Sequence, residues 1–152
     1  MSIEQKINVI IDNKPYPIPI EMRPLWRVCL ILICIAVVSG DKRYLSSKKI
    51  NILVWMLIRK NKWPDYGDYL TDRVIDSPMI SVDTATFRGI EFAKAKGFLY
   101  FDSEKIYITD SGYDLYLILL ENDIMRDEIH FLEEYGNKVT DRKIKNLTNK
   151  GK

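Results

Sequence analysis

Apolar residues follow helical spacing over much of the chain. Residues 25–39 (LWRVCLILICIAVVS) are apolar around nearly the whole circumference of a helix, which predicts a helix central to a core or an interface. Gly40 ends this segment. Between residues 46 and 59 the apolar positions again follow helical spacing, and Ser46 or Ser47 can cap the start of that helix.

The pattern changes in the middle of the chain. Residues 84–96 predict a helix with Thr84 or Thr86 as its cap, ended by Gly97, which suits a left-handed residue. After it come two β-rich runs, 98–101 and 105–109, separated by a turn of three residues.

The other segments complete the predicted set of elements. Residues 63–67 interrupt the helical pattern, 68–76 predict a short helix, and 78–82 predict a strand that pairs with the hairpin. Helices are expected over residues 111–122, 123–135 and 139–147.

The first 22 residues form an extended arm in this interpretation. Residues 3–11 alternate like a strand, and the prolines between 15 and 19 require extended backbone. The arm has too little apolar bulk to fold alone, so it either adds to the edge of the domain or lies on a partner.

The hairpin region carries a recognisable order of residues. The run K-G-F-L-Y-F, then K-I-Y-I-T-D-S-G-Y, is similar to the wing end of winged helix-turn-helix domains, with Gly97, Thr109 and Gly112 at the matching places. We therefore expect an α+β, mostly helical chain. Residues 1–22 would be the extended arm, 23–136 a winged-helix domain with a short β-hairpin wing, and 137–152 a basic C-terminal helix and tail.

Length and cysteine usage favour a cytoplasmic protein. The uncharged run from Val28 to Ser39 has 12 residues, short of the roughly 20 that a membrane span needs, and we see no signal peptide. Cys29 and Cys34 lie five residues apart on one helix and point in different directions, which favours reduced thiols over a disulfide.

Charge is distributed unevenly along the chain. Residues 41–63 carry seven basic side chains and one acidic, whereas residues 64–136 carry six basic and sixteen acidic. The wing and the helix before it therefore lie in the acidic part, which disfavours a strong phosphate-binding surface there.

No constellation of catalytic residues is visible. His130 has no second histidine or cysteine cluster beside it, the glycines form no phosphate-binding loop, and the adjacent carboxylates Asp127-Glu128 and Glu133-Glu134 suit a solvated acidic face. The sequence predicts no enzyme, no metal site and no cofactor.

Two sets of residues are candidates for contacts with partners. If DNA is bound, the helix 84–96 would present Thr84, Arg88, Glu91, Lys94 and Lys96, of which Glu91 opposes a duplex. The phosphate-contact candidates, whose alternative role is solubility, are Lys42, Arg43, Lys48, Lys49, Arg59, Lys60, Lys62, Arg88, Lys94, Lys105, Arg142, Lys143 and Lys145. The aromatic candidates for a protein interface, which could instead cover the edge of the core, are Trp55, Trp63, Tyr66 and Tyr69.

A family resemblance covers residues 23–149. It is carried by R-P-L-W-R-V-C-L-I-L-I from Arg23, L-S-S-K-K-I-N-I-L-V-W-M-L-I-R from Leu45, the winged segment, and K-V-T-D-R-K-I-K-N-L from Lys138. This order resembles the middle component of ABC three-component systems, the small subunit also found in Lamassu-type anti-phage defence. The resemblance implies a non-catalytic accessory subunit that bridges or regulates an SMC-like ABC ATPase and an effector, often a nuclease. In that case the complex, rather than this subunit alone, would bind DNA.

The alternative is a winged helix-turn-helix transcription regulator. Such a regulator would be a dimer and would bind a palindromic duplex by itself, with an affinity that falls steeply as salt rises. The accessory subunit would bind naked DNA feebly and purify with a large ATPase.

Overall fold

The computed structural model of the chain describes residues 24–81 and 83–149. This part is mostly helical with a small antiparallel sheet, so the predicted α+β class is confirmed. The arm predicted over residues 1–22 lies outside the described residues. The elements in chain order are α2 (Pro24–Ser39), η2 (Gly40–Lys42), β1 (Tyr44–Ser46), α3 (Ser47–Ile58), η3 (Lys60–Lys62), α4 (Trp63–Leu70), α5 (Thr84–Ala95), β2 (Leu99–Asp102), β3 (Lys105–Ile108), α6 (Asp110–Glu121), α7 (Arg126–Tyr135), η4 (Gly136–Lys138) and α8 (Asp141–Asn149).

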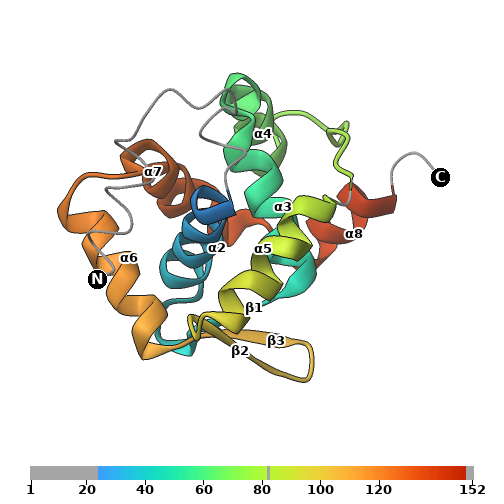
Figure 1. The fold of residues 1–152 in the computed structure, drawn as a ribbon. Helices are drawn as coiled ribbons and strands as arrows, with labels where there is room; N and C mark the ends of the chain where they lie inside the picture. The colour runs from blue at the N-terminus through green and yellow to red at the C-terminus, as the bar shows by residue number, and fades with distance from the viewer. Residues whose placement is uncertain (1–23, 82, 150–152) are drawn as a thin grey trace.

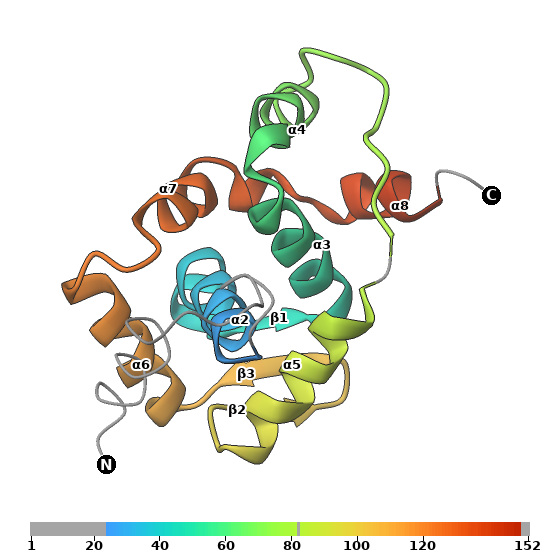
Figure 2. The ribbon, with the colours of Figure 1, turned by 45° about the horizontal axis from the view of Figure 1, so that its top comes forward.

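Helix α2 lies at the centre of the fold, with α3, α5, α6, α7 and the sheet packed around it (Figures 1 and 2). Every residue from Val28 to Ile35 is buried, which confirms the predicted core helix. By length and composition Pro24–Lys42 is, within the described part of the chain, the one helix that could cross a membrane. Its burial shows that these apolar residues form the core of a small folded domain.

The sheet has the strand order β1-β3-β2, with both pairs antiparallel. The strand predicted at 78–82 is wrong, because residues 78–81 form no strand and the third strand is Tyr44–Ser46. Residues 41–44, which lie between the helices predicted at 25–39 and 46–59, lead into this strand through η2. Burial explains the difference: Leu45 enters the core from β1, while Ile80 anchors the later segment in the core without strand pairing.

Helix α4 corrects a second prediction. The chain does not break at residues 63–67, and the helix predicted at 68–76 instead spans Trp63–Leu70. Pro64 occupies the first turn of a helix, where its missing N–H has no partner to lose. Asp72 then adopts a left-handed conformation with φ of 61°, which takes the chain out of the helical path.

The caps of α5 and α6 involve side chains outside the helices. Asp83, rather than Thr84 or Thr86, caps α5 by accepting a hydrogen bond from the backbone N–H of Ala85 at 3.0 Å. Thr109 caps α6 by accepting one from Gly112 N–H at 3.1 Å.

The turn between α5 and β2 confirms the predicted left-handed residue, since Gly97 has φ of +83°. The hydroxyl of Thr109 donates to the carbonyl oxygen of Gly97 at 2.6 Å. This hydrogen bond joins the end of α5 to the start of α6 at the base of the hairpin.

The C-terminal helices follow the predicted order, with α8 packed into the same core as the rest. Ile144 and Leu147 are buried, and Thr140 caps the helix by accepting a hydrogen bond from Lys143 N–H at 3.3 Å. Residues 137–149 are therefore part of the domain in this structure.

Candidate interaction surface

Helix α5 presents one face to α2 and the other to solvent. Thr86, Gly89, Ile90 and Ala93 form its buried face. A side chain at Gly89 would bring a Cβ within 3.0 Å of Cδ1 of Ile31, so the glycine allows close contact with α2. The helix start is held by Arg27, which donates to Asp83 at 2.8 Å and to Thr86 at 3.1 Å. These contacts set which residues of α5 face outward.

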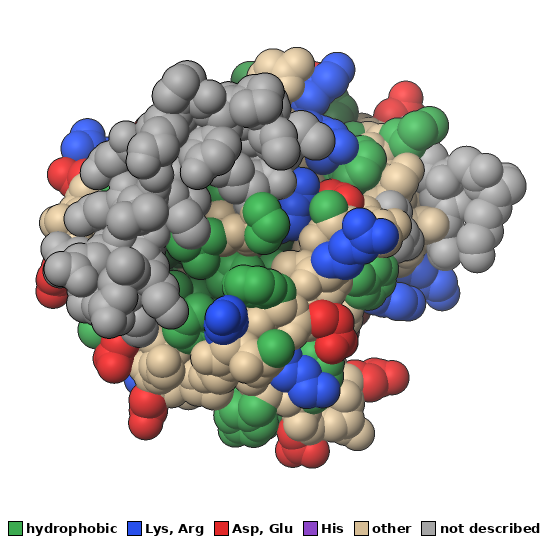
Figure 3. Space-filling view, viewed as in Figure 1, with side chains coloured by type: hydrophobic (Ala, Val, Ile, Leu, Met, Phe, Trp, Pro, Cys, Tyr) green, Lys and Arg blue, Asp and Glu red, His purple; other side chains and the backbone are tan. Residues whose placement is uncertain are grey.

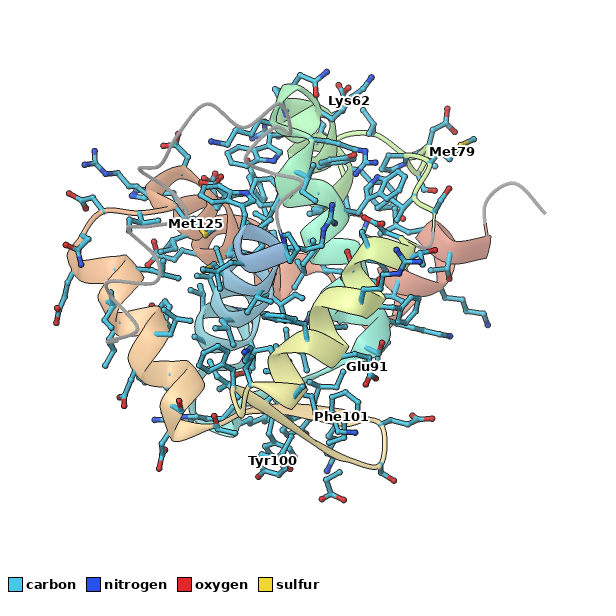
Figure 4. The ribbon with its side chains drawn as sticks, in the orientation of Figure 1. Lys62, Met79, Glu91, Tyr100, Phe101 and Met125 are labelled. Atoms are coloured by element: carbon cyan, nitrogen blue, oxygen red, sulfur yellow. The ribbon has the colours of Figure 1, made fainter. Side chains whose placement is uncertain are left out.

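The outward face of α5 mixes aromatic rings with charges of both signs. Phe87 is 43% exposed and Phe92 is 40% exposed, while Arg88 and Glu91 lie exposed between them. Hydrophobic, basic and acidic side chains interleave over this region in Figure 3. Glu91 is aimed outward beside the β2–β3 hairpin in Figure 4. A face of this composition is better suited to contact another protein than to contact the phosphate backbone of a nucleic acid.

The cations of α5 lie against aromatic rings. The ammonium of Lys94 is 4.4 Å from the centre of the Phe101 ring, and that of Lys96 is 5.5 Å from the Phe92 ring. In the neighbouring hairpin, Asp102 and Glu104 are exposed at the turn between β2 and β3. This turn therefore presents two carboxylates, which disfavour contact with phosphates.

Three tyrosines line the outer face of the sheet, and we call them the tyrosine ladder: Tyr44 on β1, Tyr107 on β3 and Tyr100 on β2. The strand register places them opposite one another across all three strands. The ring centres of Tyr100 and Tyr107 lie 4.8 Å apart with planes 6° from parallel, and those of Tyr44 and Tyr107 lie 5.1 Å apart at 48°. Tyr100 is 49% exposed and lies on the opposite side of the β2–β3 hairpin from Phe101 (Figure 4).

Of the cations proposed for phosphate contact, Lys105 lies against this ladder, with its ammonium 4.9 Å from the centre of the Tyr44 ring. Lys42 is exposed at the end of η2, and Lys48 is exposed in the first turn of α3. Arg43 is directed elsewhere, 4.0 Å from the Tyr113 ring and 3.6 Å from Asp110.

Other members of the basic set lie at the far end of α3, so the set does not form one surface. Arg59 stacks on Trp55 with its guanidinium carbon 3.3 Å from the ring centre. Lys60 pairs with Glu128 at 3.3 Å and with Asp127 at 3.7 Å. Lys62 is exposed at the end of the domain opposite Tyr100 (Figure 4).

The remaining cations proposed for phosphate contact are Lys49 on α3 and Arg142, Lys143 and Lys145 on α8, and they differ in burial and in their partners. Burial lowers the pKa of Lys49, and Asp141 nearby partly offsets that effect. Lys143 is buried and bound to Asp72 and to the Tyr69 carbonyl, so its ammonium is not available to a phosphate in this structure. Arg142 and Lys145 are exposed on α8.

The aromatic set proposed for an interface is largely used inside the domain. Tyr66 and Tyr69 are buried, and burial raises the pKa of Tyr66. Trp63 donates its indole N–H to the Met56 carbonyl at 2.8 Å and packs on Phe131. These side chains cover the edge of the core, the alternative that the sequence left open, and only Trp55 and Trp63 are partly exposed.

Hollows on the described surface include one of about 710 Å³ with Trp26, Leu30 and Leu57 in its lining. Another, of about 600 Å³, is lined in part by Trp55 and Met79. A further hollow, of about 630 Å³, has in its lining His130, the single histidine of the sequence, which is exposed. In the described part of the chain, no three His, Cys, Asp or Glu side chains are grouped as metal ligands.

Sequence reasoning did not identify the tyrosine ladder. Tyr100 and Tyr107 lie in the two predicted β-rich runs, whereas Tyr44 lies outside every predicted element, so no strand was expected at its position. Comparison with protein-family models, curated proteins and solved structures finds no match to this chain.

Proposed function

We propose that the described domain is a winged helix. The order α2, β1, α3, α5, β2, β3 and the sheet order β1-β3-β2 support this assignment, with α5 in the place of the recognition helix and β2–β3 as the wing. Helix α4 and the segment after it would then be an insertion between α3 and α5. The fold alone serves both DNA binding and protein assembly, so function has to come from the exposed surface.

We propose further that the protein is a non-catalytic accessory subunit that binds other proteins. The observation that carries this proposal is the composition of the α5–wing face. Phe87 and Phe92 are exposed on α5, and Glu91, Asp102 and Glu104 carry negative charge toward any duplex. Exposed aromatics with mixed charges are typical of protein interfaces, whereas DNA binding depends on neutralising phosphates.

The complex in which it acts is proposed from the resemblance of residues 23–149. We place the chain beside an SMC-like ABC ATPase and an effector in cytoplasmic anti-phage defence, as the subunit that holds or regulates the other two. Opposite charge on different surfaces supports docking to more than one partner. The basic residues lie at both ends of α3, and α6 and α7 carry exposed acidic groups such as Asp114 and Glu133.

A pull-down of the full-length, tagged chain expressed from its native operon tests this proposal. Stoichiometric recovery of a coiled-coil ATPase, identified by mass analysis, is the expected result. The same purified chain should shift a DNA duplex only weakly. Recovery of the chain alone as a dimer that binds duplex DNA with a steep salt dependence contradicts the proposal and favours the transcription regulator.

A further inference from the structure

We propose that the outer face of helix α6 is a docking surface for a basic, amphipathic helix of a partner protein. This inference rests on the proposed function, because it names one surface of the accessory subunit and the chemistry of what binds there. The α6 outer face consists of two leucines and two carboxylates: Asp114, Leu117, Leu120 and Glu121.

Helix α6 packs into the fold by one side only, against α2 and β3. Its buried residues are Gly112, Leu115 and Leu119. Leu117 and Leu120, by contrast, are 38% and 45% exposed. Helical spacing of three and four residues places Asp114 and Glu121 on either side of Leu117 along the helix, on the side away from the buried residues. Figures 1 and 2 both show α6 at the outside of the fold, with α2 on its inner side.

The charge on this face has one sign. Asp114 and Glu121 are exposed, and α6 contains no lysine, arginine or histidine. Neither carboxylate forms an ion pair with another residue of the described ranges 24–81 and 83–149. The cations near the ends of α6 and on α7 are already paired with other carboxylates: Arg43 with Asp110, Arg126 with Asp123, and Lys60 with Asp127 and Glu128.

Helix α7 adds negative charge beside α6. The half-buried Tyr116 of α6 has its pKa raised by burial, and then by Tyr113 and by the carboxylate of Glu133 on α7. Glu133 is exposed, so its charge lies within electrostatic reach of α6 and is open to a partner. Residues 110–135 as a whole carry eight acidic side chains and one arginine. A partner that covers the two leucines must therefore bring positive charge.

This combination decides which class of macromolecule fits. Carboxylates repel the phosphates of nucleic acids and of anionic lipids, so leucines between carboxylates are suited to neither. The backbone within a helix is already hydrogen-bonded, so a partner contacts α6 through side chains. A helix whose apolar stripe is flanked by Lys or Arg meets the leucines and the carboxylates together. Residues 1–22 of this chain hold two lysines against three acidic residues, so they do not supply the positive charge.

The test is an NMR titration of the full-length chain with a defined probe. The probe is a capped peptide of Leu, Ala and Lys, about 15 residues long, with Leu at helical spacing along one face. The comparisons are the same peptide with Glu in place of Lys, and a peptide of unchanged composition whose order leaves no apolar stripe. We expect saturable shifts of the backbone amides of 110–121 with the striped Lys peptide alone, weaker in about 200 mM than in about 50 mM salt.

Two double variants separate this surface from general electrostatics. Leu117→Gln with Glu121→Gln should weaken binding of the striped Lys peptide by about tenfold or more, because one apolar contact and one charge are lost. The matched control, Met79→Gln with Asp76→Asn, removes one exposed apolar side chain and one exposed carboxylate between α4 and α5, and should leave binding within about twofold. Well-dispersed spectra show that each variant is folded.

A charge reversal gives a result that a loss of folding cannot produce. Asp114→Lys with Glu121→Lys changes two exposed positions and should make the chain bind the striped Glu peptide in preference to the striped Lys peptide. Failure of the preference to reverse contradicts the role of the two carboxylates.

The inference is overturned if the striped Lys peptide shifts no amide of α6, if the peptide without a stripe binds equally well, or if both neutral double variants weaken binding equally. Shifts of the same amides when the chain alone is concentrated would show that a second copy covers this face, which also overturns it.

Failure of this inference differs from failure of the proposed function. An ATPase recovered equally by the wild type and by Leu117→Gln with Glu121→Gln overturns the inference alone and leaves an accessory subunit that docks elsewhere. Specific binding of the striped Lys peptide without recovery of any ATPase supports the surface and removes the proposed complex.

Discussion

The ammonium group of Lys143 on α8 lies 2.5 Å from Oδ1 of Asp72 and 3.0 Å from the carbonyl oxygen of Tyr69. Asp72 and Tyr69 belong to the end of α4 and the residues just after it, 71 to 74 positions earlier in the chain. The Lys143 side chain also lies over the Tyr69 ring, at 4.2 Å from its centre. One buried lysine therefore fastens α8 to the left-handed turn that ends α4.

Replacing this lysine should destabilise the domain. Lys143→Met keeps most of the apolar stem but removes the hydrogen bonds from the ammonium to Asp72 and to the Tyr69 carbonyl, which keeps the backbone N–H of Asp72 as a donor. This loss should lower the free energy of unfolding by about 1–3 kcal/mol. Urea unfolding followed by circular dichroism measures this loss. Lys145→Met, at an exposed position of the same helix, should change stability by less than about 0.5 kcal/mol. Equal effects of the two substitutions contradict a role for the buried contact.

The same contact predicts a dependence on acid. The hydrogen bond from Lys143, and then its charge, lowers the pKa of Asp72 from its ordinary value of 3.8. The unfolded chain thus takes up a proton at Asp72 more readily than the folded one, so this stabilisation is present above pH 3.8 and is lost as pH falls through the lower folded pKa. Thermal unfolding of wild type and Asp72→Asn between neutral pH and about pH 3 checks it. The difference between their midpoints should shrink in acid; a constant difference contradicts the assignment.

The two cysteines should be unreactive until the domain unfolds. Burial raises the pKa of the Cys29 thiol to about 12, and that of Cys34 is also raised for the same reason. Because the thiolate is the reactive form, an aromatic disulfide reagent at about pH 8 should label neither residue in the folded chain and both in denaturant. Rapid labelling of either thiol under native conditions contradicts the central position of α2.

Gly112 should not tolerate even a methyl group. A Cβ at this position would lie 2.4 Å from the carbonyl oxygen of Phe98 and 2.9 Å from Cγ1 of Ile108. Gly112→Ala must therefore push α6 away from the hairpin and should cost about 1–3 kcal/mol in stability. The control is Ser111→Ala, at the exposed neighbouring position, which should be close to neutral. Differential scanning calorimetry of the two variants measures the contrast.

Local sequence predicts those elements whose burial or turn type depends on residues that are consecutive in the chain. The all-round apolar run at 25–39 determined a core helix, because no orientation of such a helix leaves a polar face for solvent. Gly97 and the two β-rich runs after it determined the hairpin, since turn residues and strand formers lie side by side in the chain.

Tertiary structure decided the features that depend on contacts between distant residues. Tyr44–Ser46 is too short to be predicted as a strand, and it becomes one because β3 supplies its hydrogen-bond partners and Leu45 enters the core. From the sequence, Lys143 was a candidate for an exposed cation. In the structure, the turn at Asp72 brings the Asp72 carboxylate and the Tyr69 carbonyl oxygen to its ammonium group. The tyrosine ladder exists only because the register aligns Tyr44, Tyr107 and Tyr100 across three strands. Pairing between distant segments is set by the folded chain as a whole. The sequence therefore determined the core helix and the hairpin, whereas the tertiary structure decided the third strand and the surfaces.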